Sequence, residues 1–278
     1  MPIITLDSFR KKASTSAHSY YLNTILTTID HLRSNKYINA FAQKKTESTF
    51  HINQIRKQGY SIIHDFINIE LCQEYRHELD IILKKYPEYI HKNNDDQRVY
   101  GAENISANIK LFSSNSFLQK IASDYNQTET RTAFTLAAKL PYSLGNMGSG
   151  GGWHRDSCIK QFKAILYLSD VTEKNGPFQL ISHSNNLKYK LLDNKQANQP
   201  YMGYRYTNIQ VEKILSKNPN RLITFFAPAG TLILVDTSCI HRGKPIEENN
   251  RYALFNYYYP INKINASLLN QFLPLAQK

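Results

Sequence analysis

Long apolar segments are missing from this chain of 278 residues. A helix that crosses a bilayer needs about 20 consecutive apolar residues. The longest apolar-rich stretch, residues 222–235, is interrupted by Pro228 and Gly230. Residues 1–12 also lack the basic start and following apolar stretch of a secretory signal. We therefore expect a cytoplasmic protein without a transmembrane segment.

Cysteine is scarce, with only Cys72, Cys158 and Cys239 in the chain. An odd number of widely spaced cysteines argues against a disulfide framework and favours a reducing compartment. Cys158 lies two residues from Asp156, and Cys239 lies two residues from His241. We interpret both as small packing residues.

Acidic residues are the scarcer charged class, with 22 Asp and Glu against 34 Lys and Arg. The resulting net charge of +12 predicts a surface that attracts anions such as phosphorylated metabolites, acidic glycans, anionic lipid or nucleic acid. The sequence has no helix-turn-helix, zinc-finger or aromatic RNA-binding motif, so no specific nucleic-acid partner is expected. A generally basic, solvated surface is the commoner explanation of such a charge.

Two of the nine histidines belong to a pattern that predicts a metal site. His154 and Asp156 follow a glycine-rich stretch, and on an extended segment two such side chains leave the same face. His241 lies much later in the chain. Two imidazoles and one carboxylate suit iron(II) and leave other coordination positions open. The His-x-Asp spacing is weak evidence by itself, because a buried histidine is more often a hydrogen-bonded core residue.

Further segments accompany these three residues in a fixed order. They are a strand at 58–66 that leads into a helix at 71–79, a strand at 162–170 with a turn at 173–178, a Gly-initiated strand at 230–236, and a strand at 251–255. With this ordered set the chain resembles the phytanoyl-CoA dioxygenase-like family of iron(II)/2-oxoglutarate-dependent oxygenases over most of its length. The resemblance implies a mainly β fold with helical additions, whose core is a double-stranded β-helix (jelly-roll, cupin-like).

The resemblance also implies a site. His154, Asp156 and His241 would be the catalytic residues and hold Fe(II), and the cosubstrate 2-oxoglutarate would reach Arg251 with its distal carboxylate. A planar guanidinium is well suited to a carboxylate partner. The expected reaction hydroxylates an unactivated C–H bond and releases succinate and CO2.

The chain departs from the family pattern at three places. Leu180-Ile181-Ser182-His183 stands where family members often have Pro-Gly-Ser-His, and we assign His183 to loop packing. Ile165 stands where some members have an aromatic residue that contacts 2-oxoglutarate. Gly243 stands where a hydroxyl residue is usual. These changes leave the three proposed metal ligands intact.

Alternation over residues 161–168 places Gln161, Lys163 and Ile165 on one side of a strand. If Ile165 faces the interior, as the resemblance implies, Gln161 and Lys163 face inward too and are candidate cofactor-binding residues. The alternative for both is a side chain at the rim that reaches solvent.

Two regions lie outside the pattern of strands. Residues 1–50 are expected to form a helical extension packed on the core, with peripheral membrane contact as the less common alternative. Residues 51–278 are expected to form a single oxygenase domain, with a lid-like insertion at about 184–220. This insertion is rich in Tyr and Lys, which favours a polar or anionic small-molecule substrate or a glycan or lipid precursor. Nothing in the sequence specifies an oligomeric state.

Two other functions use the same residues. A cupin-like metal-dependent isomerase or lyase would need no 2-oxoglutarate, and Arg251 argues against it. A noncatalytic jelly-roll module could bind an anionic glycan or nucleic acid, and the complete set of metal ligands argues against that.

Overall fold

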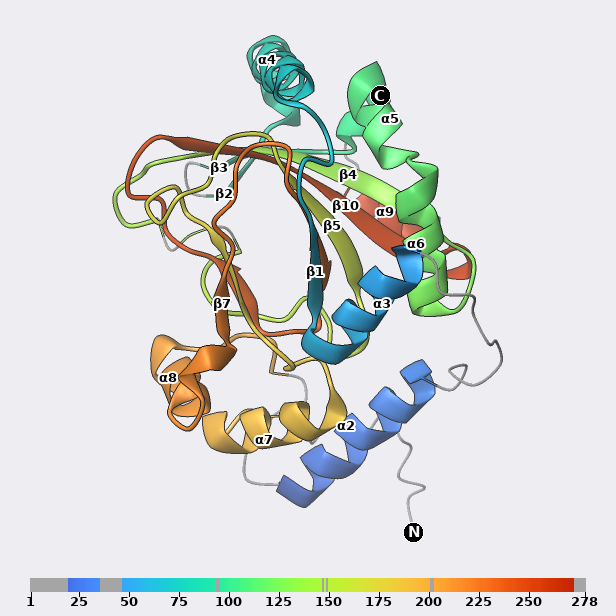
Figure 1. The fold of residues 1–278 in the computed structure, drawn as a ribbon, viewed down its shortest axis with the longest axis vertical. Helices are drawn as coiled ribbons and strands as arrows, with labels where there is room; N and C mark the ends of the chain where they lie inside the picture. The colour runs from blue at the N-terminus through green and yellow to red at the C-terminus, as the bar shows by residue number, and fades with distance from the viewer. Residues whose placement is uncertain are drawn as a thin grey trace.

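The computed structural model describes residues 20–35, 47–93, 96–146, 148, 150–200 and 203–272. Two antiparallel sheets form its centre (Figure 1). The larger has seven strands in the order β1-β8-β5-β10-β4-β3-β2, and the smaller has three in the order β7-β6-β9. The arrangement is the jelly-roll of cupin-like proteins, although the two sheets do not close into a barrel.

The strands are mostly short, apart from two long central ones. They are β1 (Tyr60–Ile63), β2 (His91–Asn93), β3 (Asp96–Tyr100), β4 (Thr130–Pro141), β5 (Phe162–Tyr167), β6 (Phe178–Ile181), β7 (Leu222–Thr224), β8 (Leu232–Asp236), β9 (His241–Gly243) and β10 (Asn250–Pro260). The α-helices of the described chain are α2 (Tyr20–Asn35), α3 (Glu47–Gln58), α4 (Ile69–Lys85), α5 (Ala107–Ser113), α6 (Ser116–Asn126), α7 (Leu187–Ala197), α8 (Asn208–Leu215) and α9 (Ala266–Phe272). Short 3-10 turns lie at Pro87–Tyr89, Ala102–Asn104, Pro219–Arg221 and Ile261–Lys263.

Helices α3 to α6 cover one face of the larger sheet (Figure 1). Strand β5 is buried along its whole length, and its alternate side chains enter different clusters. Phe162, Ala164 and Leu166 pack under the helices, whereas Ile165 and Tyr167 face the smaller sheet. This period of two places every second residue of β5 in the space between the sheets, where a ligand can be enclosed.

Helix α4 shows how local sequence sets an element. Asn68 caps its N-terminus by accepting a hydrogen bond from the backbone of Leu71. Its buried residues recur at helical spacing and face the sheet: Cys72, Tyr75, Leu79, Ile82 and Leu83. The strand and helix expected at 58–66 and 71–79 are therefore confirmed, although Cys72 replaces Leu71 on the buried face.

The structure also confirms the strands expected at 162–170, 230–236 and 251–255, which are β5, β8 and β10. The polar composition of residues 91–98 predicts a loop, and this prediction is wrong. These residues form most of the hairpin of β2 and β3, which extends the larger sheet at one edge. Charged residues made this segment look like a loop. In the structure Arg98 is only 8% exposed, because its charge is balanced by an ion pair of 2.6 Å with Asp96.

Helix α2 lies against α7, as Figure 1 shows at the lower end of the molecule. Leu26 is buried there, but Tyr21, Ile25 and Leu32 are exposed, so the predicted apolar stripe is only partly covered. The predicted boundary at residue 50 falls inside α3, and residues 1–19 and 36–46 of the proposed extension lie outside the described residues. The predicted insertion at 184–220 contains α7 and α8. Among the described residues, no helix is both long and apolar enough to cross a membrane.

Candidate active site

Two histidines distant in sequence are joined directly through their backbones. The amide of His154 donates to the carbonyl of His241 at 2.9 Å, and the amide of His241 donates back at 2.8 Å. Such a reciprocal pair fixes the two residues opposite each other, and their ring centroids lie 4.3 Å apart. The chain folds so because His241 begins β9, and residues 153–155 run alongside it.

A backbone carbonyl orients each imidazole. Nδ1 of His154 lies 2.9 Å from the carbonyl oxygen of Gly152, and Nδ1 of His241 lies 2.9 Å from that of Cys239. Because a carbonyl oxygen only accepts hydrogen bonds, Nδ1 donates in each ring, and Nε2 is the nitrogen that faces Asp156. Burial, then the neighbouring His154, lowers the pKa of His241 to about 3, so this ring is neutral at ordinary pH.

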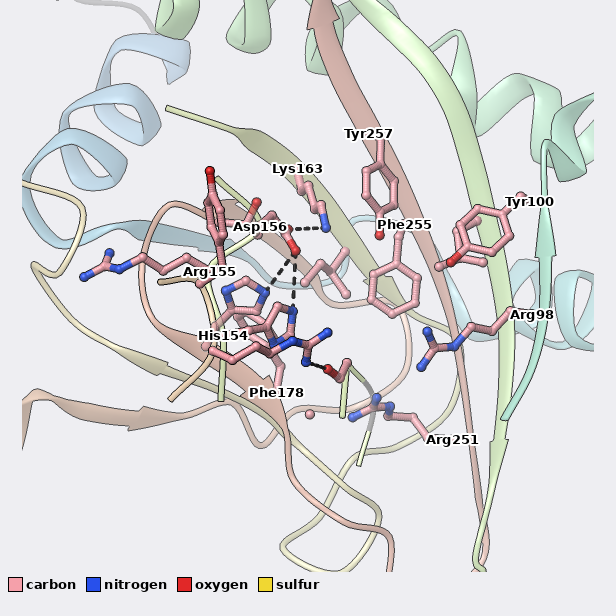
Figure 2. Close-up of a pocket in the computed structure, with 18 of the residues that line it drawn as sticks. Arg98, Tyr100, His154, Arg155, Asp156, Lys163, Phe178, Arg251, Phe255 and Tyr257 are labelled. Atoms are coloured by element: carbon pink, nitrogen blue, oxygen red, sulfur yellow. Dashed lines mark hydrogen bonds and ion pairs between the residues drawn. The ribbon is translucent and has the colours of Figure 1, made fainter. Parts of the chain in front are cut away.

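The Asp156 carboxylate completes the group. Its Oδ1 lies 3.4 Å from Nε2 of His154 and 3.8 Å from Nε2 of His241, while Oδ2 lies 2.5 Å from Nζ of Lys163 (Figure 2). Burial alone would raise the pKa of Asp156, but Lys163 foremost, followed by the two imidazoles, holds it well below its usual range. The carboxylate is therefore charged.

Arg155, between the two candidate ligands, points to the opposite side. Its guanidinium donates to the Tyr206 hydroxyl at 2.9 Å, to the Ser184 carbonyl at 2.7 Å and to the Ser238 carbonyl. Ser238 belongs to the turn that leads into His241. Arg155 thus ties the segment of His154 and Asp156 to the segment of the third ligand.

Glycines leave room for this arrangement. Gly150 has φ +90°, and a Cβ placed on it would lie 2.2 Å from Cε1 of His154. A Cβ on Gly148 would lie 2.1 Å from the carbonyl oxygen of Gly243. At Gly148 and Gly150 the glycine-rich approach to His154 therefore passes too close to its neighbours for a side chain.

A cavity of about 450 Å³ opens beside the three residues (Figure 2). Its lining is Arg98, Tyr100, Leu136, Gly150, His154, Arg155, Asp156, Lys163, Ile165, Tyr167, Phe178, Tyr204, Arg205, Thr237, His241, Gly243, Arg251, Phe255 and Tyr257. This volume falls within the range of enclosed small-molecule sites. Five cationic side chains and one carboxylate are among these residues, so the cavity favours an anion.

Arg251 is the least satisfied of these cations. It is 3% exposed, and within the described part of the chain its Nε and Nη1 atoms have no hydrogen-bond partner. Burial lowers the pKa of Arg251, with a smaller effect of Arg98 in the same direction, yet a guanidinium stays charged. Figure 2 shows Arg251 on the same side of the cavity as Arg98, across from His154 and Asp156. A buried cation with two unused donors fits an anionic ligand.

The structure brings five of the six predicted site residues to this cavity: His154, Asp156, His241, Arg251 and Lys163. Gln161 is not in the lining. Its side-chain amide donates to the carbonyl of Tyr258 at 3.1 Å, and it precedes the first paired residue of β5, Phe162. Alternation therefore does not fix its direction as it does that of Lys163, Ile165 and Tyr167.

Sequence reasoning missed Arg98 and Tyr100, which reach the cavity from β3. Tyr204 and Arg205, which also line the cavity, belong to the insertion predicted at 184–220. His183 lies away from the cavity, with Nδ1 2.7 Å from the Lys57 carbonyl, in accord with a role in loop packing.

The donor set fits a divalent metal ion. One atom from each of His154, Asp156 and His241 can be chosen so that all three lie within 4.8 Å of one another. Two imidazole nitrogens and a carboxylate oxygen are the donors of the 2-His-1-carboxylate class. These three atoms lie close enough together to share one cation.

Comparison with known proteins places the chain in a family. The family model of phytanoyl-CoA dioxygenase (PhyH) matches residues 55–249, and the chain belongs to this family. It is thereby an enzyme of the iron(II)/2-oxoglutarate-dependent class that the sequence resemblance predicted. The curated proteins searched contain no match.

Solved structures share the fold at low identity. EctD from S. alaskensis, solved with 2-oxoglutarate and 5-hydroxyectoine, has a TM-score of 0.63 at 13% identity, over 81% of each chain. The epimerase SnoN, solved with Fe3+, alpha ketoglutarate and nogalamycin RO, has a TM-score of 0.58 at 13% identity, over 76% of this chain and 82% of SnoN. HygX from Streptomyces hygroscopicus, with nickel and 2-oxoglutarate bound, has a TM-score of 0.57 at 15% identity, over 79% of this chain and 88% of HygX. At these identities the comparison supports the jelly-roll fold.

Proposed function

We propose that this protein is an iron(II)- and 2-oxoglutarate-dependent dioxygenase that hydroxylates a C–H bond of a polar or anionic small molecule or of a glycan or lipid precursor. His154, Asp156 and His241 would hold the iron, and Arg251 would bind the distal carboxylate of 2-oxoglutarate. The observation that carries the proposal is the cavity between these groups. On one side lie the three candidate ligands, and on the other lies a buried guanidinium with two nitrogens that have no partner among the described residues. When bound, iron and 2-oxoglutarate supply the oxidising chemistry.

The chain's own residues orient and shield that chemistry. The carbonyls of Gly152 and Cys239 fix the two imidazole rings through Nδ1, so each Nε2 would be available to the ion, and Arg251 would bind the distal carboxylate of the cosubstrate. Gly243 lines the cavity where the family usually carries a hydroxyl, so Arg251 would act there without that second donor. Aromatic residues enclose the remaining volume and limit water: Tyr100, Tyr167, Phe178, Phe255 and Tyr257.

Charge supports an anionic group on the substrate. An iron(II) ion and a 2-oxoglutarate dianion cancel each other, Lys163 pairs with Asp156, and Arg98 pairs with Asp96. Arg251 would meet the cosubstrate, and Arg155 is held by the Tyr206 hydroxyl and by two backbone carbonyls. Arg205 then remains at the cavity: its Nη1 donates to the carbonyls of Gly150 and Gly151, and the residue is exposed. We propose that Arg205, from the predicted lid, meets a carboxylate or phosphate of the substrate.

The central test is an anaerobic titration with Fe(II) followed by 2-oxoglutarate. We expect one ion per chain, and a charge-transfer absorption that forms only when both are present. The His154→Ala variant should form no such absorption. A protein that binds Fe(II) but turns over a substrate without 2-oxoglutarate would instead support a metal-dependent isomerase or lyase.

The outcome of the reaction needs its own measurement, because SnoN has a similar fold and is an epimerase. Candidate carboxylated or phosphorylated metabolites, incubated with enzyme, Fe(II), 2-oxoglutarate and dioxygen, would be analysed by mass spectrometry. A gain of one oxygen atom supports hydroxylation, and an unchanged mass with altered stereochemistry argues against it. The cytoplasmic location expected from cysteine usage stays a prediction that fractionation can check.

A further inference from the structure

The two oxygens of the Asp156 carboxylate have different partners. Oδ1 faces the Nε2 atoms of His154 and His241 at 3.4 and 3.8 Å, whereas Oδ2 lies 2.5 Å from Nζ of Lys163 (Figure 2). A carboxylate can give a metal ion one oxygen or both. Here the Lys163 ammonium already pairs with Oδ2, so the two oxygens of Asp156 differ before a metal ion binds.

Lys163 is firmly held in this position. It is 5% exposed and lies on β5, where it pairs with Val235 of β8 on one side and Tyr257 of β10 on the other. Its Nζ also lies 3.8 Å from the centroid of the Tyr257 ring, which provides a cation–π contact. A buried ammonium needs a charged or polar partner, and Asp156 is that partner.

We infer that Lys163 is a positioning residue that holds Oδ2 of Asp156 and thereby restricts this carboxylate to binding iron through Oδ1 alone. The inference rests on the proposed function and assigns Lys163 a task other than contact with 2-oxoglutarate. Three single-atom protein donors leave three positions of an octahedral ion open, as a bidentate cosubstrate and dioxygen together require. A second oxygen from Asp156 would block one of these positions.

The inference predicts a property of the metal site in the absence of cosubstrate. Mn(II) serves as the probe, because the relaxation of water protons reports how many exchangeable waters it carries. In the wild-type chain we expect about three, the number of open positions in a 2-His-1-carboxylate site. In Lys163→Met, which removes the ammonium but keeps a chain of similar length, Asp156 is free to bind with both oxygens, and the number should fall to about two.

Lys160→Met is the matched control. Lys160 lies three positions earlier and is not in the cavity lining, so this variant loses the same charge without touching Asp156. It should keep about three waters, as expected for the wild type. About three waters on the Mn(II) of Lys163→Met, as in the wild type, would overturn the inference. A lysine that acts only on 2-oxoglutarate would leave the number of waters unchanged when 2-oxoglutarate is absent.

A crystal structure of the wild-type chain with Mn(II) supplies a test that needs no variant. One oxygen of Asp156 on the ion, with Lys163 on the other, supports the inference. Two oxygens on the ion, or Lys163 turned away, overturns it. If the wild type binds neither Mn(II) nor Fe(II), the proposed function itself fails, and this result is distinct from a change in hydration.

Discussion

Two buried arginines of this protein have opposite surroundings. Arg221, beside the predicted lid, is 6% exposed, and both its terminal nitrogens lie 2.8 Å from the oxygens of Asp193. Its Nε donates to the carbonyl of Ser182 at 3.1 Å. Arg251, in the cavity, is 3% exposed and has two nitrogens without a partner in the described chain.

The contrast indicates that Arg221 stabilises the fold, whereas Arg251 is available to bind a ligand. A buried guanidinium loses its hydration, and the loss must be balanced by hydrogen bonds and an opposite charge. Arg221 finds both inside the protein. Arg251 carries the same desolvation cost without that compensation, so an anion from solution would supply what the fold does not.

The largest effect should come from breaking the satisfied pair. Arg221→Met leaves the Asp193 carboxylate, which is 0% exposed, without its counter-ion, and we expect the free energy of unfolding to fall by about 3–5 kcal/mol. Arg251→Met should leave stability unchanged or raise it, because it removes an uncompensated charge. Urea unfolding of the two variants measures the difference. Equal destabilisation would show that Arg251 has a partner inside the fold.

The affinity for 2-oxoglutarate, in contrast to the stability, should depend on Arg251. Arg251→Met should raise the dissociation constant of 2-oxoglutarate for the Fe(II)-loaded protein about 100-fold, because charge-assisted hydrogen bonds of roughly 1.5–3 kcal/mol are lost. Arg131→Met, an exposed change on β4, serves as the control and should bind normally. Anaerobic titration measures both. Unchanged affinity in the Arg251 variant would separate this residue from the cosubstrate.

The cosubstrate should also stabilise the folded chain through Arg251. At a concentration of about 100 times its dissociation constant, 2-oxoglutarate adds roughly 2.7 kcal/mol to the stability of the metal-loaded wild type. At the same concentration Arg251→Met should gain only about 0.4 kcal/mol, since its affinity is weaker. Thermal melts with and without ligand test this expectation. Equal shifts would contradict it.

A smaller effect is expected when the charge is kept and its shape is changed. Arg251→Lys retains a cation but loses the planar, bidentate donor, so we expect about a tenfold weaker affinity for 2-oxoglutarate, or roughly 1.4 kcal/mol. Titration of this variant beside Arg251→Met distinguishes charge from geometry. If Lys is no better than Met, geometry alone determines binding.

The sequence was informative where chemistry and periodicity agree. The alternation in β5 correctly placed Lys163 with Ile165, because a strand paired on both sides leaves its side chains only two directions. The ordered set of motifs around His154 and His241 predicted the fold, which the structure confirms. Their assignment as iron ligands remains a proposal with favourable geometry.

Other features depend on tertiary contacts that the sequence does not show. The β2–β3 hairpin escaped notice because Asp96 and Arg98 look like loop residues until each is seen to neutralise the other. Gln161 was assigned an inward direction by extending the alternation beyond the end of β5. The exposed part of α2 shows the same limit, since an apolar stripe does not reveal how much of it a neighbour covers.

Gly150 limits which substitutions the loop beside His154 can accept. Its missing side chain is the space in which one edge of the His154 ring rests, whereas a Cβ on Gly152 would meet nothing within 4 Å although both residues have φ +90°. An L-residue at position 150 would therefore displace the His154 ring, whereas at position 152 it would meet only the backbone cost of a positive φ. A change meant to stiffen this loop without moving the imidazole would be made at position 152 and not at position 150.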